Sequence, residues 1–153
     1  MSVEIIRAKI LEILQSISTD IGNNIYDYRR HAARMDDYFS LFKDGNKILG
    51  WEFYRASTAL STEFARTTSI NYESHAWVIH GIMSVDDSSA SEKLFDSKIE
   101  KIRDTFRSKI DLDGVAFEIS PMLLTNSTHM MSSLVLCHSC ELSISTTEEV
   151  QWR

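Results

Sequence analysis

Two segments of the chain carry apolar residues at the spacing of an α-helix, and each needs a surface on which to bury one face. Residues 90–109 carry one stripe, formed by Phe95, Ile99, Ile102 and Phe106. Residues 3–18 carry the other, formed by Val3, Ile6, Ile10, Ile13, Leu14 and Ile17. An amphipathic helix is stable in a protein when its apolar face packs against another element. The chain must therefore supply a second layer that covers both stripes.

Segments with strand character supply that layer. Residues 48–56 alternate apolar and polar side chains, and residues 75–85 are apolar on both faces, which is typical of a central strand. Three further segments read as strands, at 25–28, 115–120 and 133–145. A short helix is expected over 35–43, and the polar runs 57–74 and 121–132 are expected to be loops. We predict an α+β fold, a single mixed or antiparallel sheet with two main helices packed chiefly on one face.

The ends of the two helices also carry recognisable signals. Ser2 can cap the first helix, and Ser89 with Glu92 has the spacing of a capping box before the second. An exposed row of acids on the second helix is partly balanced by Arg103 and Arg107.

We expect the polar run 57–74 to be mobile in the free protein and to become ordered against a partner.

Length and composition point to one domain over residues 1–153 with a sizeable core. Charges in the first seven residues stand where a signal peptide would need an apolar run, and no segment approaches the ~20 apolar residues of a membrane span. Two cysteines do not make the disulfide framework of a small secreted domain. We expect a cytoplasmic chain with reduced thiols and no membrane partner.

Charge is distributed unevenly along the chain, whose net charge is −6. Residues 111–153 hold six acidic residues and a single basic one, Arg153, so this third cannot supply a phosphate-neutralising surface. The one basic cluster consists of Arg29, Arg30, His31 and Arg34, and aspartates bracket it. We interpret it as a salt-bridged loop or a protein interface, and expect no specific nucleic-acid partner.

The pair Cys137 and Cys140 forms a C-x-x-C pattern that invites a zinc or redox interpretation. A structural zinc site needs four ligands, and the sequence holds no second cysteine pair. In a strand the two side chains would point to opposite faces. We expect buried core cysteines and no metal or cofactor, with a metal-binding module kept as an alternative.

The other polar residues do not form a known catalytic pattern. His75 and His80 are five residues apart and point to opposite faces of a strand, and neither G-x-S-x-G nor H-E-x-x-H occurs. Glu118 and Glu141 could be paired carboxylates, but the sequence does not place them together. We therefore assign no catalytic residues and expect no enzyme. The alternative is a small-ligand-binding or enzymatic α/β domain with a pocket over the sheet, near Trp51, Trp77 and Glu118.

A larger pattern runs through most of the chain, from about residue 5 to 145. It comprises Tyr26-Asp27-Tyr28-Arg29, Phe39-x-x-Phe42, Asp44-Gly45, Gly50-Trp51-Glu52-Phe53-Tyr54-Arg55, Trp77-Val78-Ile79-His80-Gly81, Asp86-Asp87-x-x-Ala90-Ser91-Glu92, Phe95 and Cys137-His138. In order and spacing it resembles the tail terminator (tail completion, minor tail) proteins of tailed bacteriophages and prophages. The C-x-x-C pair departs from that pattern.

The resemblance implies a structural role without catalytic residues. Tail terminators have one sheet with flanking helices, and they assemble as a ring, usually a hexamer, on the last ring of the tail tube. Their partners are further copies of themselves, the tail-tube protein and the head–tail connector protein. Such a chain would act in the bacterial cytoplasm during assembly and remain in the virion tail. For the ring contact we expect Arg29, Arg30 and Arg34 to meet acidic residues after 110, among them Glu141, head to tail.

Overall fold

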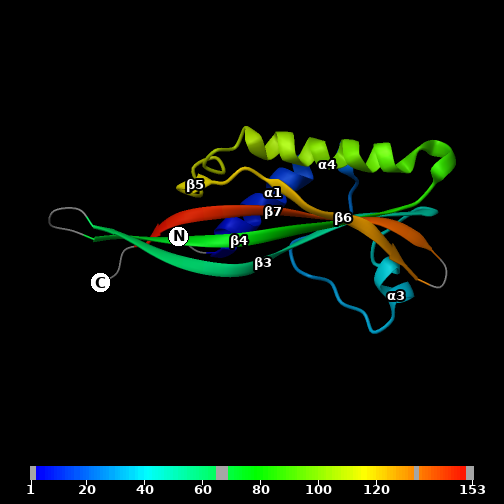
Figure 1. Ribbon diagram of the computed structural model, residues 1–153, viewed down its shortest axis with the longest axis horizontal. Coiled ribbons are helices and arrows are strands. Elements are labelled where there is room, and N and C mark those ends of the chain that lie inside the picture. Colours follow the sequence, from blue (N-terminus) through cyan, green and yellow to red (C-terminus); the bar gives the residue numbers. More distant parts are fainter. Residues whose placement is uncertain (1–2, 65–68, 133–134, 151–153) are drawn as a thin grey trace.

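The computed structural model describes residues 3–64, 69–132 and 135–150. Within these residues the fold consists of a mixed sheet and four α-helices (Figure 1). The elements in order are α1 (Val3–Ser16), α2 (Ser18–Ile21), β1 (Ile25–Tyr26), α3 (Met35–Ser40), β2 (Lys43–Asp44), β3 (Lys47–Phe64), β4 (Ser69–Ser84), the 3-10 turn η1 (Asp87–Ser89), α4 (Ser91–Arg107), β5 (Glu118–Ile119), β6 (Leu123–Met131) and β7 (Leu136–Val150).

Three long antiparallel strands, β3, β4 and β7, form the centre of the sheet. The strand order is β1-β3-β4-β7-β5, with β2 paired to β3 and β6 paired to β7. β1 runs parallel to β3, and the other pairs are antiparallel, so the sheet is mixed. The predicted α+β fold with a single mixed sheet is therefore confirmed.

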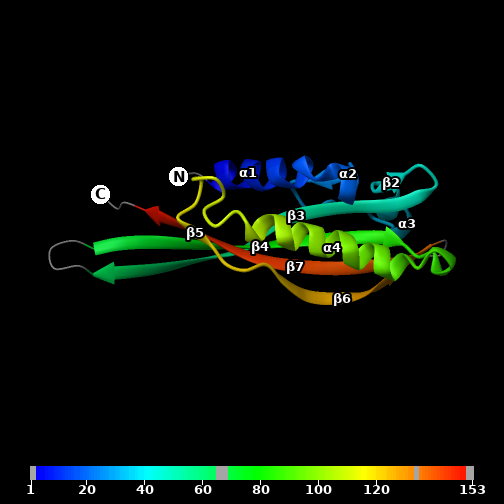
Figure 2. The same cartoon turned by 90° about the horizontal axis from the view of Figure 1, so that it is seen from above.

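The helices α1 and α4 lie side by side over one face of this sheet, and α3 lies on the other face (Figures 1 and 2). The predicted stripe of α4 is buried, as is that of α1 from Ile6 to Ile17. Both stripes pack on the apolar side chains of β3, β4 and β7. Trp51 stacks on Phe95 with ring centroids 5.7 Å apart, and its indole N–H donates to the Ile21 carbonyl at 2.9 Å. The larger core thus lies between the two long helices and the sheet.

A smaller core lies on the opposite face, under α3. Its buried members are Phe39, Phe42, Ile48, Ile82 and Cys137. Phe42 covers Gly50 so closely that a Cβ at Gly50 would lie 2.2 Å from the phenyl ring. This second core holds α3 and the segment before it against the sheet.

The predicted loop over 57–74 is wrong for the residues that the structure describes. Residues 57–64 and 69–74 are the ends of β3 and β4, which pair residue by residue and project past the helices as a hairpin, here called the arm (Figure 1). Residues 65–68 lie outside the described residues, so mobility there is untested. The prediction failed because no helix covers the arm: Arg55–Thr62 are exposed, so no apolar face marks the strand.

Two further sequence predictions need correction. Residues 123–131 of the expected loop 121–132 form β6, an edge strand exposed along almost its whole length. The expected strand 115–120 is reduced to Glu118–Ile119. β6 was missed because a strand exposed on both faces lacks the alternation by which strands are recognised.

The capping box at α4 is also wrong. Ala90 precedes the helix in the left-handed conformation (φ 55°) and makes no side-chain cap. Ser91 instead accepts a hydrogen bond from the Asp86 N–H at 2.8 Å, and its hydroxyl lies 2.8 Å from His138 Nε2. The predicted cap of α1, Ser2, lies outside the described residues. The charge pairing on the exposed face of α4 is confirmed, with Arg103–Glu100 at 2.8 Å and Arg107–Asp104 at 2.7 Å.

Candidate functional site

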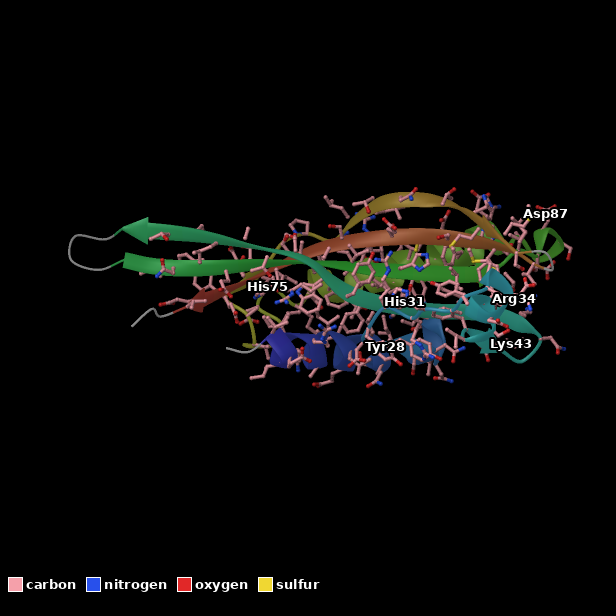
Figure 3. All side chains as sticks on the ribbon, turned by 90° about the horizontal axis from the view of Figure 1, so that it is seen from below. Tyr28, His31, Arg34, Lys43, His75 and Asp87 are labelled. Atoms are coloured by element: carbon pink, nitrogen blue, oxygen red, sulfur yellow. The ribbon has the colours of Figure 1, made fainter. Side chains whose placement is uncertain are left out.

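A cavity of about 530 Å³ opens on the α3 face of the sheet, between the segment 29–38 and the strands β3, β4, β6 and β7. We call it the sheet cavity. In Figure 3 His31 and Arg34 lie toward the α3 end of the molecule, whereas His75 lies toward the arm. Because the cavity is closed on one side by a segment far from the strands in sequence, its lining comes from five separate parts of the chain.

Glu52 is the centre of a hydrogen-bond network at this cavity, although it is only 3% exposed. It accepts hydrogen bonds from the Arg30 N–H at 2.8 Å and from the Tyr38 hydroxyl at 2.8 Å, and its Oε1 lies 3.1 Å from His80 Nδ1. Burial raises the pKa of Glu52, but the hydrogen bonds from His80, Arg30 and Tyr38 outweigh it and lower that pKa below its usual value. Burial and Glu52 raise the pKa of Tyr38, so its hydroxyl stays a donor.

His80 continues the network to a serine. Its Nε2 lies 3.0 Å from Ser139 Oγ, so Ser139, His80 and Glu52 form a chain of hydroxyl, imidazole and carboxylate across β7, β4 and β3. With the Nδ1 proton directed to Glu52, Nε2 is free to accept the proton of the serine hydroxyl. These are the three kinds of side chain, hydroxyl, imidazole and carboxylate, that nucleophilic catalysis uses in this order. Sequence reasoning missed it, because no spacing motif links residues 52, 80 and 139.

Three of the four predicted interface residues line the sheet cavity, and the fourth, Arg34, does not. Arg29 lies over the Tyr54 ring at 4.6 Å and Arg30 over the Tyr26 ring at 4.4 Å, and both line the sheet cavity together with Glu141. Arg34 is exposed and lies 3.9 Å from Asp36. Arg29, Arg30 and Glu141 therefore lie on the same side of the molecule, whereas a head-to-tail contact between them would need them on different sides. Whether these four residues contact another copy stays a prediction.

The pocket expected near Trp51, Trp77 and Glu118 is not where the sheet cavity lies. Both tryptophans are fully buried under the helices, on the opposite face of the sheet from that cavity. Glu118 is exposed opposite Thr147, whereas Glu141 lies opposite Asn126, so the structure does not bring these two carboxylates together.

Both cysteines are buried, as predicted, and they point to opposite faces of β7. Cys140 belongs to the core under α1 and α4, and Cys137 to the core under α3. Burial raises the pKa of Cys137 to about 11 and that of Cys140 to about 12. The thiolate that metal binding or nucleophilic attack requires is therefore scarce at neutral pH.

His75 and His80 lie on opposite faces of β4, as predicted, and His75 belongs to a second polar cluster. Glu73, His75 and Glu148 gather where the arm leaves the helical layer, with one ligand atom of each within 4.8 Å of the others. We call these three residues the arm-base cluster. Sequence reasoning missed this cluster, because Glu148 lies more than 70 residues after Glu73 and His75 in the chain.

Among the described residues no helix has the length and apolar character needed to cross a membrane. Comparison with models of known protein families gave no match for this chain, and comparison with curated proteins gave none either.

Proposed function

We propose that this chain is a ring-forming structural protein of a phage or prophage tail, of the tail terminator type, and that its copies join by pairing the edges of their sheets. The observation that carries the proposal is that both edges of the sheet offer a long strand segment without a charged residue or a proline. These two segments are Ser57–Thr62 of the arm and Leu123–Met131 of β6.

The first edge is the outer side of β3. Within the described residues β3 pairs on this side with β2 at Lys47–Ile48 and with β1 at Trp51–Glu52. Beyond Glu52 no described strand pairs with it. The backbone groups of Ser57–Thr62 that face away from β4 are therefore available for a strand of another chain.

The second edge is β6, on the opposite side of the sheet. It pairs with β7 on one side only among the described strands. Three large apolar side chains near its ends are exposed, Leu123 to 56%, Leu124 to 40% and Met131 to 71%. Exposed apolar residues along an unpaired edge favour association with another strand.

Edge strands of monomeric proteins are usually protected by lysine, proline or inward-pointing charges. In this chain 25% of the residues are charged, yet Ser57–Thr62 and Leu123–Met131 carry no Asp, Glu, Lys or Arg, and the charges nearest to the first segment on β3 are Arg55 and Glu63. Because the two edges lie on opposite sides of one sheet, pairing the arm of one copy with β6 of the next is a heterologous contact. Repeated contacts of this kind close into a ring when the rotation permits.

A ring agrees with the resemblance to tail terminators, from which we take the remaining parts of the proposal. The ring, a hexamer by that resemblance, would cap the tail-tube protein and meet the head–tail connector protein. The acidic C-terminal third would keep DNA from adhering as it passes through.

The edge contact is tested by placing one lysine on each edge. Ser61→Lys in the arm and Ser127→Lys in β6 should each weaken self-association at least tenfold, because each places a charge on an edge that has to be desolvated. Ser97→Lys, on the exposed face of α4, is the matched control and should associate like the wild type. Sedimentation equilibrium of the three variants gives the comparison. Equal association of all three variants and the wild type would contradict edge pairing.

A second candidate function, acyl transfer at the sheet cavity, is favoured by the Ser139–His80–Glu52 chain. There His80 Nε2 would take the proton of Ser139 as Oγ attacks the acyl carbon of an ester or amide, and would return it to the departing alcohol or amine, while Glu52 holds the imidazole. In the second half of the reaction His80 would take a proton from the water or alcohol that removes the acyl group from Ser139. This function predicts that a fluorophosphonate probe labels Ser139 in the wild type and fails to label His80→Gln. Mass spectrometry of the intact chain detects the adduct, and an unlabelled wild type would contradict the reaction.

A further inference from the structure

We infer that the arm-base cluster binds one divalent transition-metal cation through Glu73, His75 and Glu148. The inference does not depend on the proposed ring. It rests on the geometry of the three side chains, on the charges that the sheet register places opposite each other, and on the way His75 is held.

The three ligand atoms are spaced for a common ion. His75 Nε2 lies 3.2 Å from Glu148 Oε1 and 3.9 Å from Glu73 Oε2. Ligands at 2.0–2.1 Å from a tetrahedral Zn²⁺ are separated from each other by about 3.3 Å. The first distance already matches that separation. The second exceeds that separation by about 0.6 Å, and the three atoms lie only within 4.8 Å of one another. Glu73, the most exposed of the three side chains, therefore has to move closer to the other two when the ion binds.

The register of β4 and β7 sets two carboxylates against each other. Glu73 and Glu148 are directly opposite residues of this antiparallel pair, and like charges in that position destabilise a sheet. The Glu148 side chain is only 5% exposed, so water does little to reduce the repulsion. A cation between the two carboxylates would turn this repulsion into attraction.

His75 is held as a metal-binding histidine usually is. Its ring is almost fully buried, and its Nδ1 lies 2.9 Å from Thr58 Oγ1 on β3. Metal-binding imidazoles commonly donate the N–H of the other ring nitrogen to an oxygen in this way. The contact with Thr58 therefore directs Nε2 toward the two carboxylates.

One imidazole and two carboxylates suit Zn²⁺ and its neighbours better than Ca²⁺ or Mg²⁺, which take oxygen ligands only. Three protein ligands leave the fourth position for water, and the side chain of Glu73 is 30% exposed, which gives that position access to solvent. A bound ion would tie β4 to β7 at the base of the arm and so hold the arm in one direction relative to the sheet.

Equilibrium dialysis and calorimetry with Zn²⁺ test the site. The wild type should bind one equivalent of Zn²⁺ and gain thermal stability from it. Glu73→Gln, a nearly isosteric change of a partly exposed side chain, should weaken Zn²⁺ binding at least tenfold and abolish the Zn²⁺-dependent rise in Tm.

The matched control is His129→Ala. The rings of His129 and His138 lie 5.1 Å apart, so this histidine pair is the alternative site at which Zn²⁺ could bind. Binding by His129→Ala at wild-type affinity, together with the loss in Glu73→Gln, supports the arm-base cluster. A wild type that binds no Zn²⁺, or binding that is unchanged in Glu73→Gln, would overturn the inference.

Discussion

Replacing Gly81 with alanine is expected to lower the free energy of unfolding by about 3 kcal/mol. A Cβ at Gly81 would lie 2.3 Å from Trp51 Cζ3, and the Trp51 indole is fully buried, stacked on Phe95 and hydrogen-bonded to Ile21. The ring therefore cannot move aside without losing contacts in the larger core. Overpacking a filled core costs roughly 1–3 kcal/mol and occasionally more. Urea unfolding followed by tryptophan fluorescence measures the loss.

Gly45→Ala is the control for this substitution. No atom lies within 4 Å of a Cβ at Gly45, so only its left-handed backbone (φ +64°) opposes the change, at a cost of roughly 1 kcal/mol. In the double variant Gly81→Ala with Trp51→Phe, the smaller ring leaves room for the new methyl group. Its destabilisation should be smaller than the sum of the two single effects. Equal destabilisation by Gly81→Ala and Gly45→Ala would contradict the packing of Trp51 on Gly81.

Glu52→Ala is expected to destabilise the protein by about 3–4 kcal/mol at pH 7. The substitution removes the carboxylate that Arg30 N–H, Tyr38 and His80 share. These three groups then lose the hydrogen-bond partner that Glu52 provides. Removing one partner from a buried charged network costs roughly 3–5 kcal/mol. Glu100→Ala, which breaks only the exposed pair with Arg103, should cost less than about 1 kcal/mol. Urea unfolding of both variants gives the comparison.

The same residue gives the stability a pH dependence of known sign. The pKa of Glu52 is lower in the folded protein than its usual 4.5, so the folded state favours the carboxylate. The stabilisation is therefore complete above pH 4.5 and is lost as the pH falls through the lower pKa of the folded state. Glu52→Gln should flatten the stability curve in that acidic range. If the stability of Glu52→Gln falls below pH 4.5 as steeply as that of the wild type, groups other than Glu52 cause the loss of stability in acid.

The parts of the fold that could be predicted from the sequence are those that bury at least one apolar face. The stripes of α1 and α4 were found because each lies against the sheet, and β4 from His75 onward was found because its two faces lie in two cores. The arm and β6 were missed for the opposite reason. Ser57–Thr62 and nearly all of β6 are exposed on both faces, and residues 70–74 are only half-buried, so these segments leave no alternating pattern in the sequence.

The polar sites could be predicted only in part. Alternation placed Glu52 on the opposite face of β3 from Trp51, and it placed His75 and His80 on opposite faces of β4, as the structure has them. Which residues then meet depends on the register of β3 with β4 and of β4 with β7. Glu52 faces His80, and Glu73 faces Glu148, only because of pairings between segments that lie 28 and 75 positions apart. The sequence of one strand does not specify which residues of a distant strand lie opposite it, so this register could not be predicted.

The measurement that tests the proposed ring most directly is the mass of the wild-type protein in solution over a wide range of concentration. Analytical ultracentrifugation should show a monomer giving way to one larger species of fixed mass, six chains by the tail terminator resemblance, that does not grow further because a ring is closed. A monomer at every concentration, or a dimer that adds no further copies, would contradict the ring and with it the proposed function.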